Sequence, residues 1–144
     1  MKPASAKQKG RRFQQQIATS ICEKFNFNPQ DVRSVSMGAR GEDILMSSSA
    51  EVVFPYSIEC KNVERLNIWA AIEQATCNAT NGKTPIVAFH KNRSQTYVAM
   101  PWQHFLDLTH KVNALTEDAK IQAGPAPWEC PDTAAKSSEQ TLGS

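Results

Sequence analysis

The chain has 144 residues, of which 16 are Lys or Arg and 14 are Asp or Glu, and its formal net charge is +2. This length corresponds to about one domain, and the apolar and charged fractions are those of an ordinary globular protein. No apolar run approaches the roughly 18 residues of a membrane span, and no secretory signal opens the sequence, so we expect an intracellular, cytoplasmic protein without a membrane partner.

The charge is distributed unevenly along the chain. Up to Lys111 there are 14 basic and 9 acidic residues, whereas from Val112 onward there are 2 basic and 5 acidic residues. The N-terminal segment is basic and contains no acid. Residues 1–8 are predicted to form a flexible basic arm, which is either a solvated tail or a segment that binds phosphate groups.

A first helix is predicted from residue 9 onward. Apolar side chains recur at every fourth position, in Phe13, Ile17, Ile21 and Phe25, which indicates a core-facing stripe. The segment Asn-Phe-Asn-Pro then ends the helix.

A polar segment, SVSMGARGEDI, follows the first helix, and its glycines Gly38 and Gly41 permit sharp turns. A short strand over residues 43–46 and a longer strand over residues 54–62 are predicted next. The turn SSSA joins them, so the two strands are expected to form a β-hairpin. Pro55 cannot donate to a strand ladder and indicates a sheet edge or a bulge.

Helix and strand patterns alternate in the remainder of the domain. We predict a helix over residues 66–78, strands over residues 84–90 and 96–100, and a short helix after them. The fold class is therefore α/β, with a central mixed β-sheet flanked by helices.

The C-terminal part of the chain differs in composition. Beyond about Leu115 it turns to Ala, Pro, Ser, Thr and Gly with little periodicity, which predicts a largely disordered tail. We place the folded domain at residues 9–111 and an acidic tail at residues 112–144.

Two opposite charges stand at the end of the predicted strand FPYSIECKN. Alternation places Glu59 and Lys61 on the same face, about 7 Å apart. Such a pair alone is typical of an exposed cross-strand ion pair. Pairing with the preceding strand would bring Asp43 beside Glu59, and two adjacent carboxylates suit Mg²⁺ or Mn²⁺. Lys61 would then orient a water molecule or stabilise charge on a phosphate.

The surroundings of these three residues favour a nucleic-acid substrate. The chain contains no P-loop and no G-x-G-x-x-G motif, which argues against an enzyme that acts on small phosphate compounds. The basic residues that we expect to contact DNA phosphates are Lys7, Lys9, Arg11, Arg12, Arg40, Arg65, Lys91 and Arg93.

Four segments occur in an order that resembles the PD-(D/E)XK nucleases. They are KGRRFQ in the first helix, SMGARGEDI before the first strand, FPYSIECKN in the second strand and WAAIEQA in the following helix. Over about residues 8–106 the chain is similar to the Holliday junction resolvase-like endonucleases of phages and prophages. The resemblance implies a restriction-endonuclease-like core and metal-dependent cleavage of DNA.

The resemblance also implies a role for each matching residue. Asp43 and Glu59 would bind a divalent metal ion, Mg²⁺ with Mn²⁺ as a substitute, together with the main-chain carbonyl of Cys60. Lys61 would contact the scissile phosphate or the attacking water. Gln74 matches a glutamine often placed near the site, although an exposed helix residue is an equally good interpretation.

Gln14 is a departure from the pattern, because many members have a glutamate at this position that helps the metal site. A neutral amide binds a divalent cation more weakly, so we expect one metal ion rather than two. Glu42, which is adjacent to Asp43, is an alternative acid. It is interpreted instead as a solvated loop residue that faces the other way.

The other residues that often carry chemistry are given structural interpretations. Trp69 and Trp102 are expected in the core or an interface rather than as platforms for bases. His104 and His110 are expected at the surface of the last helix. The cysteines form no C-x-x-C pair, and most are expected to be small buried residues rather than zinc ligands: Cys22, Cys60, Cys77 and Cys130.

We therefore expect a DNA endonuclease that prefers branched or junction DNA and acts as a homodimer. If the chain is phage-encoded, it would act in the cytoplasm of the bacterial host. One alternative is a nicking or repair-type nuclease on duplex DNA, and another is an accessory protein that binds DNA structure without cutting. Dependence of turnover on a divalent metal separates the nucleases from the binding protein.

Overall fold

The computed structural model describes residues 3–35 and 40–119. The chain divides into two compact units, residues 1–107 and 108–144. The described helices and strands are α1 (Pro3–Phe25), β1 (Val32–Ser34), β2 (Ile44–Met46), α2 (Ser48–Val53), β3 (Tyr56–Asn62), α3 (Ile68–Asn78), β4 (Thr84–His90), β5 (Tyr97–Ala99) and α4 (Trp102–Ala119). Among these helices, none is long and apolar enough to cross a membrane.

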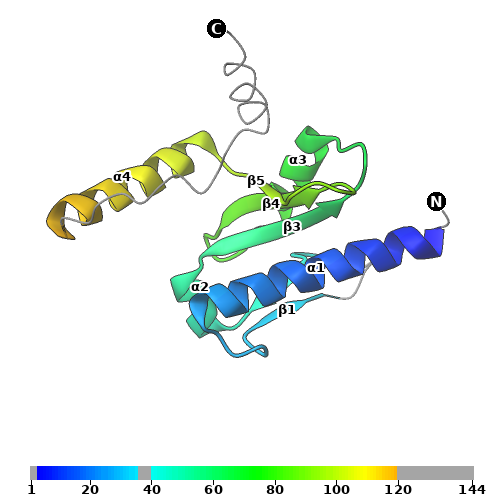
Figure 1. The fold of residues 1–144 in the computed structure, drawn as a ribbon, viewed down its shortest axis with the longest axis horizontal. Coiled ribbons are helices and arrows are strands. Elements are labelled where there is room, and N and C mark those ends of the chain that lie inside the picture. Colours follow the sequence, from blue (N-terminus) through cyan, green and yellow to red (C-terminus); the bar gives the residue numbers. More distant parts are fainter. Residues whose placement is uncertain (1–2, 36–39, 120–144) are drawn as a thin grey trace, which may run out of the picture. The chain divides into compact units, whose positions relative to one another are not determined.

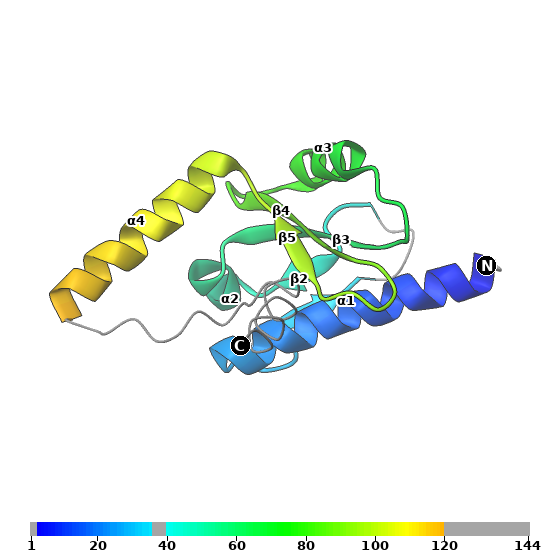
Figure 2. The same cartoon turned by 45° about the horizontal axis from the view of Figure 1, so that its top comes forward.

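The predicted α/β fold with a mixed sheet is confirmed. Strands β3 and β4 pair in parallel, with Glu59 opposite Val87, and β4 pairs with β5 in the antiparallel direction. Helix α3 connects the two parallel strands, since a parallel pair needs a crossover connection of this kind. Helices α1 and α3 lie on opposite sides of the sheet (Figures 1 and 2).

The predicted hairpin between residues 43–46 and 54–62 is wrong. Strand β2 pairs instead with β1, which overlaps the predicted polar segment SVSMGARGEDI only at Ser34. The segment between β2 and β3 is not a tight turn, because Ser47 is the N-cap of α2 and its Oγ accepts a hydrogen bond from the amide of Ala50 at 3.3 Å. Gly41 precedes β2 with φ of 109°, as expected for a turn glycine, whereas Gly38 lies outside the described residues.

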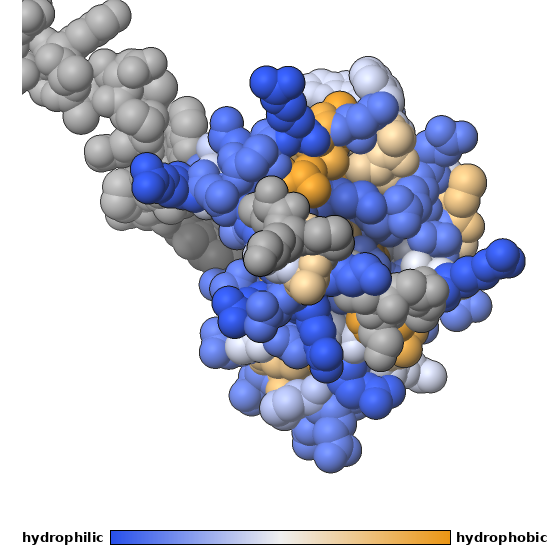
Figure 3. All heavy atoms as spheres, turned by 90° about the vertical axis from the view of Figure 1, so that its right-hand side faces the viewer, coloured by the Kyte–Doolittle hydropathy of each residue, from blue (hydrophilic) through white to orange (hydrophobic). Residues whose placement is uncertain are grey.

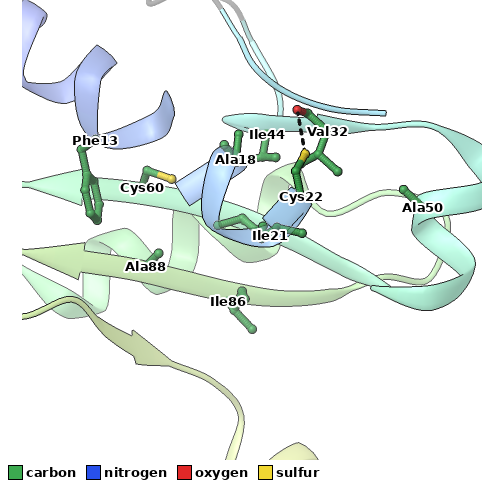
Figure 4. Close-up of a cluster of buried hydrophobic side chains, with 11 residues drawn as sticks. Phe13, Ala18, Ile21, Cys22, Val32, Ile44, Ala50, Cys60, Ile86 and Ala88 are labelled. Carbon is green, nitrogen blue, oxygen red and sulfur yellow. Dashed lines mark hydrogen bonds between the residues drawn. The ribbon is translucent and has the colours of Figure 1, made fainter. Parts of the chain in front are cut away.

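The main core lies between α1 and the sheet. Side chains of α1 (Phe13, Ala18, Ile21 and Cys22) pack against residues of β3 and β4 (Ile58, Cys60, Ile86 and Ala88), as Figure 4 shows. On the other face, Ala71 and Ala75 of α3 pack against Val87. Because both faces of the sheet are covered, β3 is buried on both sides, and its polar residues Ser57 and Glu59 are also buried.

Two helix boundaries differ from the predictions. Helix α1 begins at Pro3, so residues 3–8, which were expected in a flexible arm, are helical. Helix α4 continues to Ala119, past the expected domain boundary at residue 111. The remainder of the expected disordered tail, residues 120–144, lies outside the described residues.

Several side chains lie elsewhere than expected. Trp69 and Trp102 are 78% and 70% exposed, so neither is a core residue. His104 is half-buried rather than a surface residue, and its Nε2 lies 2.7 Å from the hydroxyl of Tyr56. Phe25, although predicted in the core stripe, is 42% exposed.

The free cysteines follow the prediction only in part. Cys22 and Cys60 are buried, and burial raises the pKa of both thiols. Cys77 is exposed. Cys130 lies outside the described residues.

Candidate active site

Asp43 is the residue directly before β2, and it joins this strand to β3. Its main-chain amide donates a hydrogen bond to the carbonyl of Ile58 at 3.2 Å. Its carboxylate Oδ2 accepts a hydrogen bond from the amide of Cys60 at 2.8 Å. Asp43 therefore lies beside the end of β3, as the hairpin prediction required, although β2 and β3 do not form a hairpin.

Glu59 and Lys61 point from the same face of β3, as predicted. Lys61 Nζ lies 2.7 Å from Oε1 of Glu59 and donates a hydrogen bond to Oε1 of Gln74 at 3.0 Å. Glu59 is only 2% exposed, so the pair is not the exposed cross-strand ion pair that was the alternative interpretation. Gln74 on α3 is exposed and contacts Lys61, so its position is compatible with both interpretations that the sequence left open.

The two carboxyl groups are in an environment that disfavours their negative charge. Burial is the main cause that raises the pKa of Asp43, although the Cys60 amide and Lys61 act against it. Burial also raises the pKa of Glu59, and the nearby charge of Asp43 raises it further. The ammonium group of Lys61 therefore does not fully compensate the carboxylates of buried Glu59 and half-buried Asp43, and a cation placed between them would relieve the repulsion.

The oxygen atoms at the site fit a divalent cation. Within the described residues, three buried side-chain oxygens have no hydrogen-bond partner, namely Gln14 Oε1, Glu59 Oε2 and Asn62 Oδ1. Gln14 is 4% exposed, and its side chain interacts with the Asp43 carboxylate and lowers its pKa. Carboxylate and amide oxygens without partners are the hard ligands that Mg²⁺ and Mn²⁺ prefer.

Strand geometry directs the main-chain carbonyl of Cys60 toward the Asp43 carboxylate. In an extended strand the N–H and C=O groups of one residue point to the same edge. Because the Cys60 N–H donates to Asp43, its C=O also points to the Asp43 edge of β3 rather than toward β4. Within the described residues no group of three or more His, Cys, Asp and Glu side chains forms a metal cluster. An amide and a main-chain carbonyl would complete the ligand set here.

Glu42 does not take the place of the missing glutamate, and it is not a solvated loop residue. It is buried, and its carboxylate accepts hydrogen bonds from Lys83 at 2.6 Å and from Thr80 at 3.2 Å. Lys83 also contacts Glu51 at 2.9 Å. Sequence reasoning missed Lys83, because a single lysine before a strand has no pattern that distinguishes it from a surface residue.

Asn78 is a second residue that sequence reasoning missed. It lies at the C-terminal end of α3, and its side chain interacts with Glu59 and lowers the pKa of that carboxyl group. Its position one helical turn after Gln74 was the available signal, since residues four apart lie on the same helix face.

The predicted DNA-binding residues are not all in one place. Lys9, Arg12 and Arg93 line one groove together with Asn62 and His90. The other five are exposed but do not line this groove: Lys7, Arg11, Arg40, Arg65 and Lys91.

A mixed sheet between two helices, with an Asp before one strand and a Glu-x-Lys in the next, defines a nuclease-like α/β protein of the PD-(D/E)XK class. The chain matches the model of the family described as "Phage putative PDDEXK endonuclease" over residues 5–124, and it belongs to this family. No curated protein and no solved structure matches the chain.

Membership in an endonuclease family implies a nucleic-acid substrate. PD-(D/E)XK proteins typically use a divalent metal ion. The unpartnered oxygens of Gln14 and Glu59 fit such an ion on independent grounds.

Proposed function

We propose that the protein is a divalent-metal-dependent DNA endonuclease that hydrolyses phosphodiester bonds, with Mg²⁺ as its metal and Mn²⁺ as a substitute. The observation that supports this best is the arrangement of Asp43, Glu59 and Lys61. The carboxyl groups of buried Glu59 and half-buried Asp43 lie close together and have raised pKa values, one oxygen of Glu59 has no partner among the described residues, and the ammonium group of Lys61 contacts Glu59.

The metal ligands that we propose are the carboxylates of Asp43 and Glu59 and the carbonyl of Cys60, with the amide oxygen of Gln14 beside them. A bound divalent cation would activate a water molecule and neutralise charge on the scissile phosphate. The neutral Gln14 leaves two carboxylates at the site, which favours one metal ion rather than two.

Lys61 supplies the positive charge that the chain itself brings to the phosphate. Its ammonium group is held between Glu59 and Gln74, so little conformational freedom is lost when it contacts the substrate. In this position it stabilises the charge that develops on the phosphate oxygens or orients the attacking water. Gln74 positions Lys61 and does not itself need to touch the substrate.

Branched DNA, such as a four-way junction, is the substrate that we propose. This choice rests on the resemblance of the motif order to junction resolvases. Concerted cleavage of two strands of a junction requires two active sites, so we also propose that the active form is a homodimer. Light scattering of the purified protein, alone and with junction DNA, tests the dimer independently of cleavage.

The decisive experiment is cleavage of a labelled four-way junction and of a duplex with the same sequence, in Mg²⁺, Mn²⁺ and EDTA. Glu59→Gln is the matched variant, because it keeps the shape of the side chain and removes the charge. Metal-dependent cleavage of the junction alone, absent in the variant, supports the full proposal.

The remaining outcomes each contradict a defined part of the proposal. Cleavage of both substrates keeps the nuclease and contradicts the junction preference. Tight binding without cleavage in either metal contradicts the nuclease and supports a protein that binds DNA structure. Equal cleavage by wild type and Glu59→Gln contradicts the assigned site.

A further inference from the structure

A polar groove lies between α1 and the turn that connects β4 to β5. Its volume is about 400 Å³, and it is lined by Lys9 and Arg12 of α1, by Asn62 and His90 at the ends of β3 and β4, and by Arg93 of the turn. No Asp or Glu is among the lining residues. Figure 3 views the side of the molecule on which α1 begins and β3 ends, and most of that surface is hydrophilic.

The groove adjoins the candidate active site through shared elements. Asn62 directly follows Lys61 on β3 and pairs with His90 of β4. The ring of Phe13 stacks on His90 with ring centroids 4.5 Å apart, and the next residue, Gln14, interacts with Asp43. The groove therefore lies at the same end of β3 as the candidate active site, on the α1 side of the sheet, whereas Glu59 and Lys61 contact α3.

Arg93 has a backbone conformation that its side chain does not favour. Its φ is 60°, and the other described non-glycine residues with positive φ are Asn26 and Asn81. Asparagine tolerates the left-handed region, whereas arginine is uncommon there. A residue keeps an unfavourable backbone conformation only where its surroundings impose it, and such conformations are frequent at functional sites. The conformation of Arg93 therefore suggests a function for its side chain.

The surroundings of the turn do impose this conformation. Glu64 Oε1 accepts a hydrogen bond from the amide of Asn92 at 3.0 Å, and Ser94 Oγ accepts one from the amide of Lys91 at 3.1 Å. Glu64 also contacts Lys9 at 3.5 Å. Exposed ion pairs of this kind contribute little free energy, so Lys9 can exchange Glu64 for a phosphate group with little loss. The turn is thus anchored on both sides of Arg93.

We propose that this groove binds the phosphate backbone of the DNA strand that leads away from the cleavage site, with Lys9, Arg12 and Arg93 as the phosphate contacts. This inference rests on the proposed function. Lys9 and Arg12 lie three residues apart on one face of α1, which places two cations side by side.

The test is equilibrium binding of fluorescent DNA in EDTA, where no cleavage occurs, at several NaCl concentrations. Arg93→Gly and Arg12→Gln should each weaken binding about tenfold, and each should lower the slope of log K against log salt by about one contact. Arg93→Lys should retain most of the affinity. Arg33→Gln, which removes an exposed charge from β1, and Asn81→Gly, which relaxes another left-handed residue, should bind like the wild type.

Thermal unfolding separates a binding role from a structural one. Arg93→Gly should unfold at the wild-type temperature or above it, because glycine suits positive φ. A lower unfolding temperature with unchanged affinity would mean that Arg93 serves the fold, and the proposal would be wrong.

The outcomes for the groove and for the nuclease are distinguishable. Metal-dependent cleavage by the wild type, with wild-type affinity and salt slope in Arg93→Gly and Arg12→Gln, overturns the groove and leaves the nuclease. If Arg33→Gln weakens DNA binding as much as the groove variants do, the effect is one of net charge rather than of the groove, and the groove proposal is wrong. Selective losses without any cleavage support the groove and contradict the nuclease, and absence of DNA binding in the wild type contradicts both.

Discussion

Two neighbouring residues, Glu42 and Asp43, belong to two acid–base clusters that differ in how their charges are compensated. Glu42 and Glu51 share the buried ammonium group of Lys83 at 2.6 and 2.9 Å. Burial by itself lowers the pKa of Lys83, but its hydrogen bonds to the two carboxylates outweigh this effect, and the pKa is raised. This cluster is satisfied within the chain.

The cluster on the other side of the backbone is not satisfied in the same way. Asp43 and Glu59 have raised pKa values, and an oxygen of Glu59 has no partner. A buried charge that is left incompletely paired costs stability. The comparison shows that the charges of the Glu42 cluster are compensated within the chain, whereas those of Asp43 and Glu59 are compensated only in part, as the proposed metal site requires.

The largest expected effect is on catalysis. Asp43→Asn and Glu59→Gln should each lower the cleavage rate by at least about 10²- to 10³-fold, the effect of removing one electrostatic contact to a transition state. Neither should lower the thermal stability of the metal-free protein, because each removes a repelling charge. Cleavage assays and thermal unfolding of the same samples check this, and near-normal cleavage in either variant would contradict the site.

The opposite pattern is expected for the Glu42 cluster. Lys83→Met should lower the free energy of unfolding by about 3–5 kcal/mol, because it leaves two carboxylates without their buried partner. Chemical denaturation measures this loss. Cleavage per folded molecule, measured well below the unfolding temperature, should stay near the wild-type value. A selective loss of cleavage would assign Lys83 to the chemistry instead.

The pH dependence of stability should also differ between the clusters. The folded protein binds protons at Asp43 and Glu59 more tightly than the unfolded chain, because both pKa values are raised. In EDTA, their contribution to stability is therefore greatest below the ordinary carboxyl range and is lost as the pH rises through that range to the raised values. Comparing wild type with Asp43→Asn/Glu59→Gln in unfolding experiments isolates this contribution.

Addition of Mg²⁺ provides the matching test. The ion binds the ionised carboxylates, so it should raise the unfolding temperature of the wild type more strongly at higher pH. The double variant should show no such increase. An equal increase in both proteins would place the ion elsewhere.

The smallest effect is expected for Gln14→Glu, which tests why an amide occupies this position. A third carboxylate beside Asp43 should tighten Mg²⁺ binding by roughly tenfold, in the range of 10- to 100-fold changes seen when groups around a metal are altered. It should also lower the stability of the metal-free protein by adding a like charge. Metal titration by calorimetry measures the first effect, and weaker Mg²⁺ binding would show that Gln14 does not face the metal.

Much of the fold could be predicted because its signals are local. The strand over residues 84–90 has the predicted bounds, and α3 begins only two residues after the predicted position. The pairing of β2 with β1 could not be predicted in the same way. The segment SSSA is compatible both with a turn and with a helix N-cap, and only the packing of α2 decides between them.

The candidate site was predictable to the extent that it depends on strand alternation. Glu59 and Lys61 share one face of β3 as alternation predicted, whereas Asp43 was placed beside them by a hairpin that is absent and Gln74 by the family resemblance alone. Lys83 was not found, because its role arises from contacts between elements that are far apart in the sequence, whereas Asn78 was missed although its position one helical turn after Gln74 was a local signal. Glu42 was misinterpreted for the same reason, since its partner Lys83 lies 41 residues away.

The sequence by itself determined the order of the elements, the apolar stripe of α1 and the face of β3 that carries Glu59 and Lys61, because the helical and strand periods depend only on local geometry. The tertiary structure decided which charges are compensated. Long-range packing removes these acidic groups from water. It makes Glu42 a buried partner of Lys83 rather than a surface acid, and it leaves the charges of Asp43 and Glu59 only partly compensated by Lys61.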